Sequence, residues 1–427
     1  MLRMRLIAMI AAVFAAATSL APSPGFAEPA SIDDTARILA GMPPSALSPL
    51  AVYQKDAFWQ QHARNFDAAW QNLDRRQLSK VRAFVAKNFN NPQPVLFYFF
   101  SGPDFLYANT FFPSADTYVM AGLEPPGPVP DLAKLSRPQL ASALGELRSS
   151  LNSVLSYSFF RTKSMRLDFG SGRLQGTLPV LMTFLVRSGM TINRVSLIDL
   201  QGDGSIHPAE DNVSNVTAKG AKIVFFDSIG KTKTLYYFST DLSDTGIRTS
   251  GFMQFCDTLG HGDSFIKSAS YLMHQDNFST VRDYLLYHSV SILEDDSGIP
   301  IRYFAHGWRL YPYGRYVGPI RLFGNLYQSQ LNSVFGKGRA TPIDFGIGYR
   351  WRPNESNLLL AVRDGTATAI DLPPASPETV APEKTLRNDV REAKAEAPAP
   401  RKKTRAYRRH KRQADGGPYE IFGYSTP

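Results

Sequence analysis

The chain has 427 residues, a formal net charge of +10 and a single cysteine, Cys256. One cysteine cannot close an intramolecular disulfide, which excludes the class of small disulfide-stapled proteins and leaves apolar burial to stabilise the fold. Without its two ends the chain keeps about 340 residues, more than a single core usually holds, so we expect one large domain or two tightly packed ones.

Residues 1–27 have the pattern of a secretory signal peptide. Arg3 and Arg5 precede an apolar run over residues 6–21, and small residues end the segment. That run is shorter than the roughly 20 apolar residues a membrane-spanning helix requires. The pattern therefore predicts cleavage after Ala27 and a periplasmic or secreted protein, with no transmembrane segment after signal removal.

The body, residues 28–365, begins with helical periodicity and continues with strands. Apolar residues recur every three to five positions over residues 57–89, which predicts an amphipathic helix with a break near Arg76. A fully apolar run at 95–100 then leads through a glycine turn and a short helix to a second run at 117–123. Continuous apolar strands joined by a helix are typical of a parallel sheet covered on both faces.

Two acids follow these strands, Asp104 after the first and Glu124 after the second. Ligands of open parallel sheets bind outside the carboxyl ends of the strands, so both are weak candidates for catalytic residues. The turn lacks G-x-G-x-x-G, so topology alone supports dinucleotide or methyl-donor binding. The simpler interpretation of the Gly-Pro-Asp sequence is a turn that only reverses the chain.

The remaining elements predict a mixed α/β fold with a partly parallel sheet covered by helices. We expect helices at 137–160, 172–188, 264–274 and 279–293, the last capped by Ser279. Strands are expected at 193–200, 221–228 and 233–242, the last two joined as a hairpin, with short strands and loops over 301–362. We interpret Cys256 as a buried apolar residue, since no lysine or histidine adjoins it in sequence.

Residues 199–210 resemble in part a twelve-residue calcium loop. Asp199, Asp203 and Glu210 fall at positions one, five and twelve, and Gly204 at position six supplies the sharp turn. Gln201 stands at position three, where an acid or asparagine is usual, and the flanking segments do not predict helices. Calcium binding is therefore the weaker hypothesis, and a β-hairpin with Asp and Gly at its tip is preferred.

Histidines and acids between residues 261 and 296 supply further weak candidates. Two histidines and two aspartates could form a zinc or iron site: His261, Asp263, His274 and Asp276. Their spacing matches no metal-binding motif, so the alternative is that they are ordinary surface or core residues. A hydrolase stays possible without a nominated nucleophile. The acids at 294–296 close a predicted helix, where the helix dipole disfavours anions. Either the helix ends earlier and water screens the acids, or they pair with Arg302, Arg309 or a cation.

An aromatic and arginine-rich segment is the best candidate for a ligand surface. Aromatic faces stack on sugar rings, and guanidinium groups hold carboxylates or phosphates. Alternatively, such residues only seal the end of a sheet. The candidate ligand-binding residues are Trp308, Arg309, Tyr311, Tyr313, Arg315 and Tyr316.

Residues 366–427 form a tail rich in Pro, Ala, Lys and Arg, a composition that predicts disorder. Eight of the twelve residues from Arg401 to Arg412 are lysine or arginine, and none is acidic. The segment is either a solvated linker or an electrostatic arm for an anionic envelope component, namely lipid, lipopolysaccharide or wall polymer. Because the chain is predicted to be exported, no nucleic-acid partner is expected.

Two hypotheses follow. The favoured one is a cell-envelope-associated binding protein that uses the aromatic and arginine surface for a glycan or anionic ligand and the tail as a tether. The alternative is an exported α/β enzyme, a hydrolase or transferase, with its site at the carboxyl ends of the strands. No catalytic motif is complete, which is why the binding protein is favoured.

Overall fold

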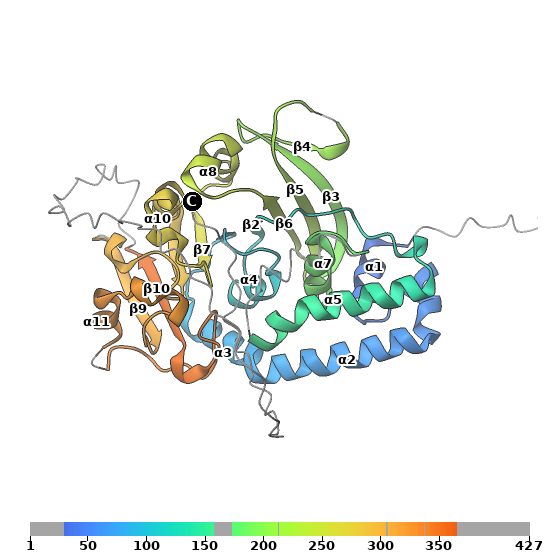
Figure 1. Cartoon of the computed structure of the whole chain (residues 1–427), viewed down its shortest axis with the longest axis horizontal. Coiled ribbons are helices and arrows are strands. Elements are labelled where there is room, and N and C mark those ends of the chain that lie inside the picture. Colours follow the sequence, from blue (N-terminus) through green and yellow to red (C-terminus); the bar gives the residue numbers. More distant parts are fainter. Residues whose placement is uncertain (1–29, 158–172, 212, 305, 337, 365–427) are drawn as a thin grey trace, which may run out of the picture.

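The computed structural model describes residues 30–157, 173–211, 213–304, 306–336 and 338–364 (Figure 1). The predicted signal peptide and the tail from residue 365 lie outside the described residues. Within the described ranges, no helix is both long enough and apolar enough to cross a membrane.

One mixed sheet of ten strands runs through the described chain in the order β4-β3-β5-β6-β2-β1-β7-β8-β10-β9. Its five central strands are parallel: β6 (Thr232–Ser239), β2 (Thr117–Gly122), β1 (Val95–Tyr98), β7 (Gly262–Ile266) and β8 (Ser289–Glu294). Antiparallel strands flank them: β3 (Thr191–Gln201), β4 (Ile206–Pro208) and β5 (Val216–Phe226) on one side, β9 (Trp308–Gly314) and β10 (Asn357–Arg363) on the other. The prediction of a mixed, partly parallel α/β sheet is confirmed.

Helices cover both faces of the sheet and bury two separate apolar layers. The larger layer contains residues of α1 (Ile32–Leu39), α2 (Ala57–Leu73), α3 (Ser79–Asn88), α4 (Phe105–Phe111), α5 (Arg137–Tyr157) and α7 (Leu178–Arg187). The other layer contains residues of α8 (Asp244–Ser250), α9 (Phe252–Asp257) and α10 (Ser279–His288). A further helix, α11 (Ser329–Phe335), packs beside β9. Short 3-10 helices occupy Pro49–Lys55, Leu132–Lys134, Ala209–Asp211, Leu272–His274, Asp276–Phe278, Ile301–Tyr303, Arg321–Leu326 and Pro353–Glu355.

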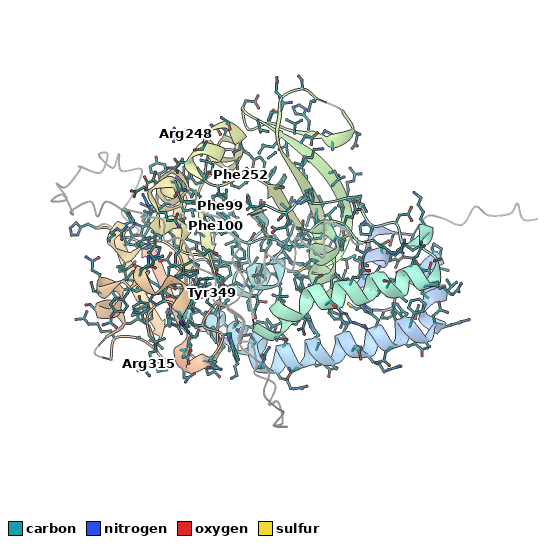
Figure 2. All side chains as sticks on the ribbon, in the orientation of Figure 1. Phe99, Phe100, Arg248, Phe252, Arg315 and Tyr349 are labelled. Carbon is teal, nitrogen blue, oxygen red and sulfur yellow. The ribbon has the colours of Figure 1, made fainter. Side chains whose placement is uncertain are left out.

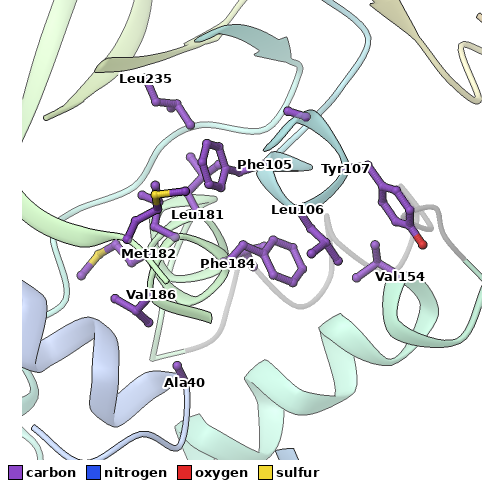
Figure 3. Close-up of a cluster of buried hydrophobic side chains, with 14 of the residues drawn as sticks. Ala40, Phe105, Leu106, Tyr107, Val154, Leu181, Met182, Phe184, Val186 and Leu235 are labelled. Atoms are coloured by element: carbon purple, nitrogen blue, oxygen red, sulfur yellow. The ribbon is translucent and has the colours of Figure 1, made fainter. Parts of the chain in front are cut away.

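The larger layer fixes α4, the helix that follows β1. Phe105 and Leu106 of α4 lie close to Leu181 and Phe184 of α7 in the core (Figure 3), and all four side chains are almost fully buried. Burying one such side chain stabilises a fold by about 1.5–3 kcal/mol. The turn between β1 and α4 is therefore held at both ends, by the sheet and by this core.

Several sequence predictions are confirmed within the described residues. The first helical segment breaks at a π-helical turn, Asp74–Leu78, which contains Arg76. The two predicted strands around 95–123 are parallel, and β5 and β6 pair as an antiparallel hairpin. Cys256 is a fully buried free thiol.

Two helix predictions are wrong. Residues 262–266 form strand β7 instead of starting a helix, and the predicted helix at 279–293 ends at His288, where β8 begins. Ser279 is the first residue of α10, not its cap, and its hydroxyl donates to Asp244 at 2.7 Å. Both segments are short apolar runs whose periodicity does not separate helix from buried strand, so pairing with β1 and with each other decides the outcome.

The packing of α9 makes a prediction about thiol chemistry. Burial raises the pKa of the Cys256 thiol well above its ordinary value, and only the thiolate reacts readily with disulfide reagents. We expect the native protein to react with Ellman's reagent only as fast as it unfolds, while the chain in guanidinium reacts at once. Full labelling of the native protein within seconds would contradict this packing.

Candidate functional site

The central strands have the order of a doubly wound sheet. Numbered along the chain, the parallel strands β1, β2, β6, β7 and β8 lie in the spatial order 3-2-1-4-5. The connection from β1 to β2 passes through α4 in the larger apolar layer, whereas that from β7 to β8 passes through α10 in the other layer. The two connections diverge, so a crevice opens between the carboxyl ends of β1 and β7, where folds of this type bind ligands.

A pocket of about 150 Å³ lies at this crevice. We call it the switch-point pocket. It is lined by segments that follow β1, β2, β6 and β7, and among its lining residues are Phe100, Gly102, Asp104, Glu124, Asp241 and Lys267. Phe100 lies near the middle of the molecule in Figure 2, close to Phe99.

A buried ion pair forms part of the pocket. The ammonium Nζ of Lys267 lies 2.6 Å from Oδ2 of Asp104, and each side chain is only 2% exposed. Asp104 also accepts from the Tyr98 hydroxyl at 2.9 Å and from the Tyr107 amide at 3.2 Å, which caps α4. The ammonium lies 4.2 Å from the centre of the Tyr107 ring.

The pair joins the ends of two neighbouring strands. Asp104 follows β1 and Lys267 follows β7, so their contact spans the crevice between the two diverging connections. Burial raises the pKa of Asp104, and the positive charge of Lys267 opposes that shift. Removing two charges from water costs several kcal/mol, so such a pair is weak evidence for stability and more typical of a functional site.

Glu124 lies on the neighbouring side of the pocket, after β2, and is 6% exposed. A Cβ atom added to Gly122 would lie 3.2 Å from Oε2 of Glu124 and 3.1 Å from Cα of Gly102. The Tyr237 hydroxyl donates to the backbone carbonyl of Glu124 at 2.8 Å. Gly122 thus leaves room for the carboxyl group beside the β1–α4 turn, and a larger residue at this position would fill that space.

The third part of the site is residues 268–271, which follow Lys267; we call them the wall loop. Ser268, Ser270 and Tyr271 have φ angles of 54°, 54° and 55°, and only one other described non-glycine residue, Asn215, has a positive φ. The left-handed conformation costs about 1–2 kcal/mol for each such residue. Strain of this kind persists where the surrounding structure enforces it, and it concentrates at functional sites.

The structure brings together two of the four predicted catalytic candidates. Asp104 and Glu124 both line the switch-point pocket. His261 and Asp263 lie at the opposite end of β7 from Lys267. There the His261 ring nitrogen Nδ1 is 3.1 Å from the His288 carbonyl, and Asp263 accepts from the Gln93 amide and the Ser291 hydroxyl.

The proposed calcium ligands do not form one cluster. Asp199 lies within β3, opposite Lys219 and His207. Asp203 accepts from the amide and hydroxyl of Ser205 at the tip of the β3–β4 hairpin, and Glu210 follows in a short 3-10 helix. Strands flank the segment in place of the helices of a calcium-binding hand. Among the described residues, no group of three or more His, Cys, Asp or Glu is arranged to hold a metal ion.

The aromatic and arginine-rich segment is divided between different environments. Trp308 packs against the apolar layer that contains α10, Tyr313 lies in the larger layer, and Tyr316 lies in a small cluster with Leu331. The exposed side chains are Arg309, which pairs with Asp364 at 2.7 Å, Tyr311 and Arg315. Figure 2 shows Arg315 at the edge of the molecule, away from Phe100. Three of the six residues therefore contribute to cores.

Glu294 is the last residue of strand β8, and Asp295 and Asp296 follow it, so the expectation that the three acids close a helix is wrong. All three are buried, so water does not screen them. Of the two arginines expected to pair with them, Arg309 binds Asp364 and Arg302 donates to the Tyr303 hydroxyl. Burial, followed by the charge of Asp296, raises the pKa of Asp295 to about 6.

Lys267 and the wall loop are the parts of the site that the sequence did not indicate. Had residues 262–266 been assigned to a parallel strand, Lys267 would have been the first polar residue after its carboxyl end. No known protein family, curated protein or solved structure matches this chain. The pocket's own geometry is therefore what indicates a function.

The ion pair predicts a specific pattern of stability changes. Lys267→Met or Asp104→Asn alone leaves a buried partner uncompensated, so each should lower the free energy of unfolding by about 3–5 kcal/mol. The double variant should lose less than the sum of the two single variants, as measured by chemical denaturation.

The surface pair Arg82–Asp74, whose side chains are 52% and 39% exposed, is a matched control. Removing either of its partners should change stability by no more than about 1 kcal/mol. Strictly additive effects of the Lys267 and Asp104 variants would show that the two charges do not depend on each other.

Proposed function

We propose that the chain is an exported α/β enzyme of the hydrolase or transferase class, whose site is the switch-point pocket. We further propose that its ligand carries neighbouring hydroxyl groups, as a nucleoside or another sugar derivative does. The observation that carries this proposal is the meeting of the Lys267–Asp104 pair, Glu124 and the wall loop around one pocket at the divergence of β1 and β7.

The position of Glu124 supports the ligand class. In doubly wound folds of this strand order, an acidic residue about 20 positions after the glycine turn accepts hydrogen bonds from ribose hydroxyls. Glu124 lies 22 positions after Gly102. A carboxylate has two acceptor oxygens and therefore suits a pair of adjacent hydroxyl groups.

The β1–α4 turn argues against a dinucleotide. Folds that bind a pyrophosphate place it at the amino end of the helix after the first strand, against free backbone amides. Here the carboxyl group of Asp104 occupies that end and caps the Tyr107 amide. A ligand that is neutral or cationic at this point fits better, and Phe100, Leu242 and Phe278 supply apolar walls for a flat ring.

The buried charges suggest how the site could act on such a ligand. The Lys267 ammonium is fixed by Asp104 and by the Tyr107 ring in a water-poor environment. A fixed positive charge there can stabilise negative charge that develops on a substrate during hydrolysis or group transfer. The six aromatic and arginine residues give no comparable support to glycan binding at the surface, because they do not share one face.

Export and surface attachment are part of the proposal. The signal pattern of residues 1–27 supports a periplasmic or secreted location. The cluster from Arg401 to Arg412 supports a tether to anionic lipid, lipopolysaccharide or wall polymer, since each basic residue contributes up to about 1 kcal/mol near such a surface.

Calorimetric titration with adenosine tests the ligand class. We expect the wild-type protein to bind adenosine more tightly than 2′-deoxyadenosine, because the latter lacks one hydroxyl group. Glu124→Gln should weaken adenosine binding by roughly tenfold, through loss of charge-assisted hydrogen bonds. Gly122→Leu should abolish binding by filling the pocket.

Asp203→Asn, at the tip of the β3–β4 hairpin, serves as the control for loss of a carboxylate outside the pocket and should leave affinity unchanged. The proposal fails if the wild-type protein binds neither adenosine nor ribose nor glucose, or if Gly122→Leu binds as the wild type does.

Sedimentation with phosphatidylglycerol vesicles tests the tether. Truncation before Arg401 should release the protein from the vesicles and remove the salt dependence of binding. A truncation before Gly416, which keeps all the basic residues, should bind as the full chain does. Equal binding of both truncated proteins would show that the basic cluster is not the tether.

A further inference from the structure

Three consecutive acids lie directly behind the wall loop. Glu294, Asp295 and Asp296 end and follow β8, the strand that pairs with β7, and they are 3%, 5% and 5% exposed. None of them lines the switch-point pocket, whereas Lys267 and wall-loop residues of the neighbouring strand end do. Asp295 and Asp296 therefore act on the pocket from behind its lining, through the wall loop and, for Asp295, through its charge near Tyr98.

Asp295 holds the first half of the wall loop. Its Oδ2 accepts from the Ser268 amide at 2.9 Å, and its Oδ1 accepts from the amide and hydroxyl of Ser297. The Ser297 hydroxyl in turn accepts from the Ala269 amide at 2.8 Å. One carboxyl group thus fixes, directly or through Ser297, two successive backbone amides of the strained loop.

Asp296 holds the end of the same loop. Its Oδ2 accepts from the Tyr271 hydroxyl at 2.5 Å, and its Oδ1 accepts from the Asn357 amide group at 3.1 Å. Tyr271 is the last of the three non-glycine residues in the left-handed conformation. The strained backbone is therefore tied at both ends to two adjacent carboxyl groups.

We propose that Asp295 and Asp296 are positioning residues that hold the wall of the switch-point pocket, and that the wall tightens when Asp295 is protonated and loosens when it is ionised. This inference rests on the proposed function only in assigning a ligand to the pocket. The ties between the acids and the loop are independent of that ligand.

The linkage between proton binding and wall closure determines how the stability of the closed wall changes with pH. Burial is the largest cause that raises the pKa of Asp295, and the negative charge of Asp296 adds to it. Opening of the wall loop would admit water and lower that pKa, so the closed wall binds the proton more strongly than the open wall. The closed wall is then stabilised most fully below the lower pKa that Asp295 has in the open wall. This extra stability declines as pH rises and is lost above about 6.

Other ionisable groups lie around Asp295. Burial lowers the pKa of His274 to about 4, so it stays neutral in the relevant range. Burial raises the pKa of Glu294 as it does that of Asp295, so Glu294→Gln, which should leave the pH-dependent step in place, separates the two acids. Burial raises the pKa values of Tyr98 and Tyr271 above an ordinary value that is already alkaline, so both hydroxyls stay neutral. The positive charge of Arg350 opposes the rise in the Asp296 pKa.

Hydrogen exchange of the full-length protein between about pH 5 and 7 tests the inference, with rates corrected for intrinsic exchange. The Ser268 and Ala269 amides should be roughly tenfold better protected at pH 5 than at pH 7, and their protection should become constant above the Asp295 pKa. Asp295→Asn should remove the step. Asp296→Asn should move it to lower pH, because one cause of the raised Asp295 pKa is gone.

The control is Asp263→Asn, which alters another buried acid, at the opposite end of β7, and should leave the step in place. Protection that does not change with pH in the wild type, or a step that survives Asp295→Asn, would overturn the inference. Adenosine calorimetry at both pH values separates the two proposals. A step in a protein that binds neither adenosine nor ribose nor glucose would uphold the positioning residues and reject the ligand class.

Discussion

The ion pair between Asp104 and Lys267 is the contact on which the arrangement of this protein's site depends. It links the first turn of α4, which belongs to the larger apolar layer, to the end of β7, whose connection enters the other layer. Because both charges are buried, neither side chain can move away without leaving its partner uncompensated in a low-dielectric environment. The ion pair therefore holds the lining of the crevice between the two diverging connections in a fixed position.

Several features near this ion pair lower the stability of the folded protein. Buried charges, three left-handed non-glycine residues and three adjacent buried acids all lie after the carboxyl ends of β1, β7 and β8. Elsewhere two apolar layers cover the sheet, and buried charges such as Lys233 and Asp263 are scattered singly. Buried charges and strained backbone that cluster at one edge of a sheet are typical of a ligand-binding or catalytic site.

The sequence predicted the fold class and one half of the site. Asp104 and Glu124 could be found because a long apolar run before each acid marks a buried parallel strand. Lys267 could not, because the apolar run before it is short and its periodicity also fits a helix. The same ambiguity hid β8 and made the acids after it resemble a helix end. Residues 308–316 were misleading in another way, since composition does not tell which aromatic side chains of an edge strand face a core.

A crystal structure of the protein grown with excess adenosine would test most directly whether the crevice between β1 and β7 is the ligand site. We expect the nucleoside in the switch-point pocket, with both ribose hydroxyls within hydrogen-bonding distance of the Glu124 carboxylate and no displacement of the Asp104–Lys267 pair. Adenosine bound elsewhere on the chain, or an ordered but empty pocket at saturating adenosine, would contradict the account.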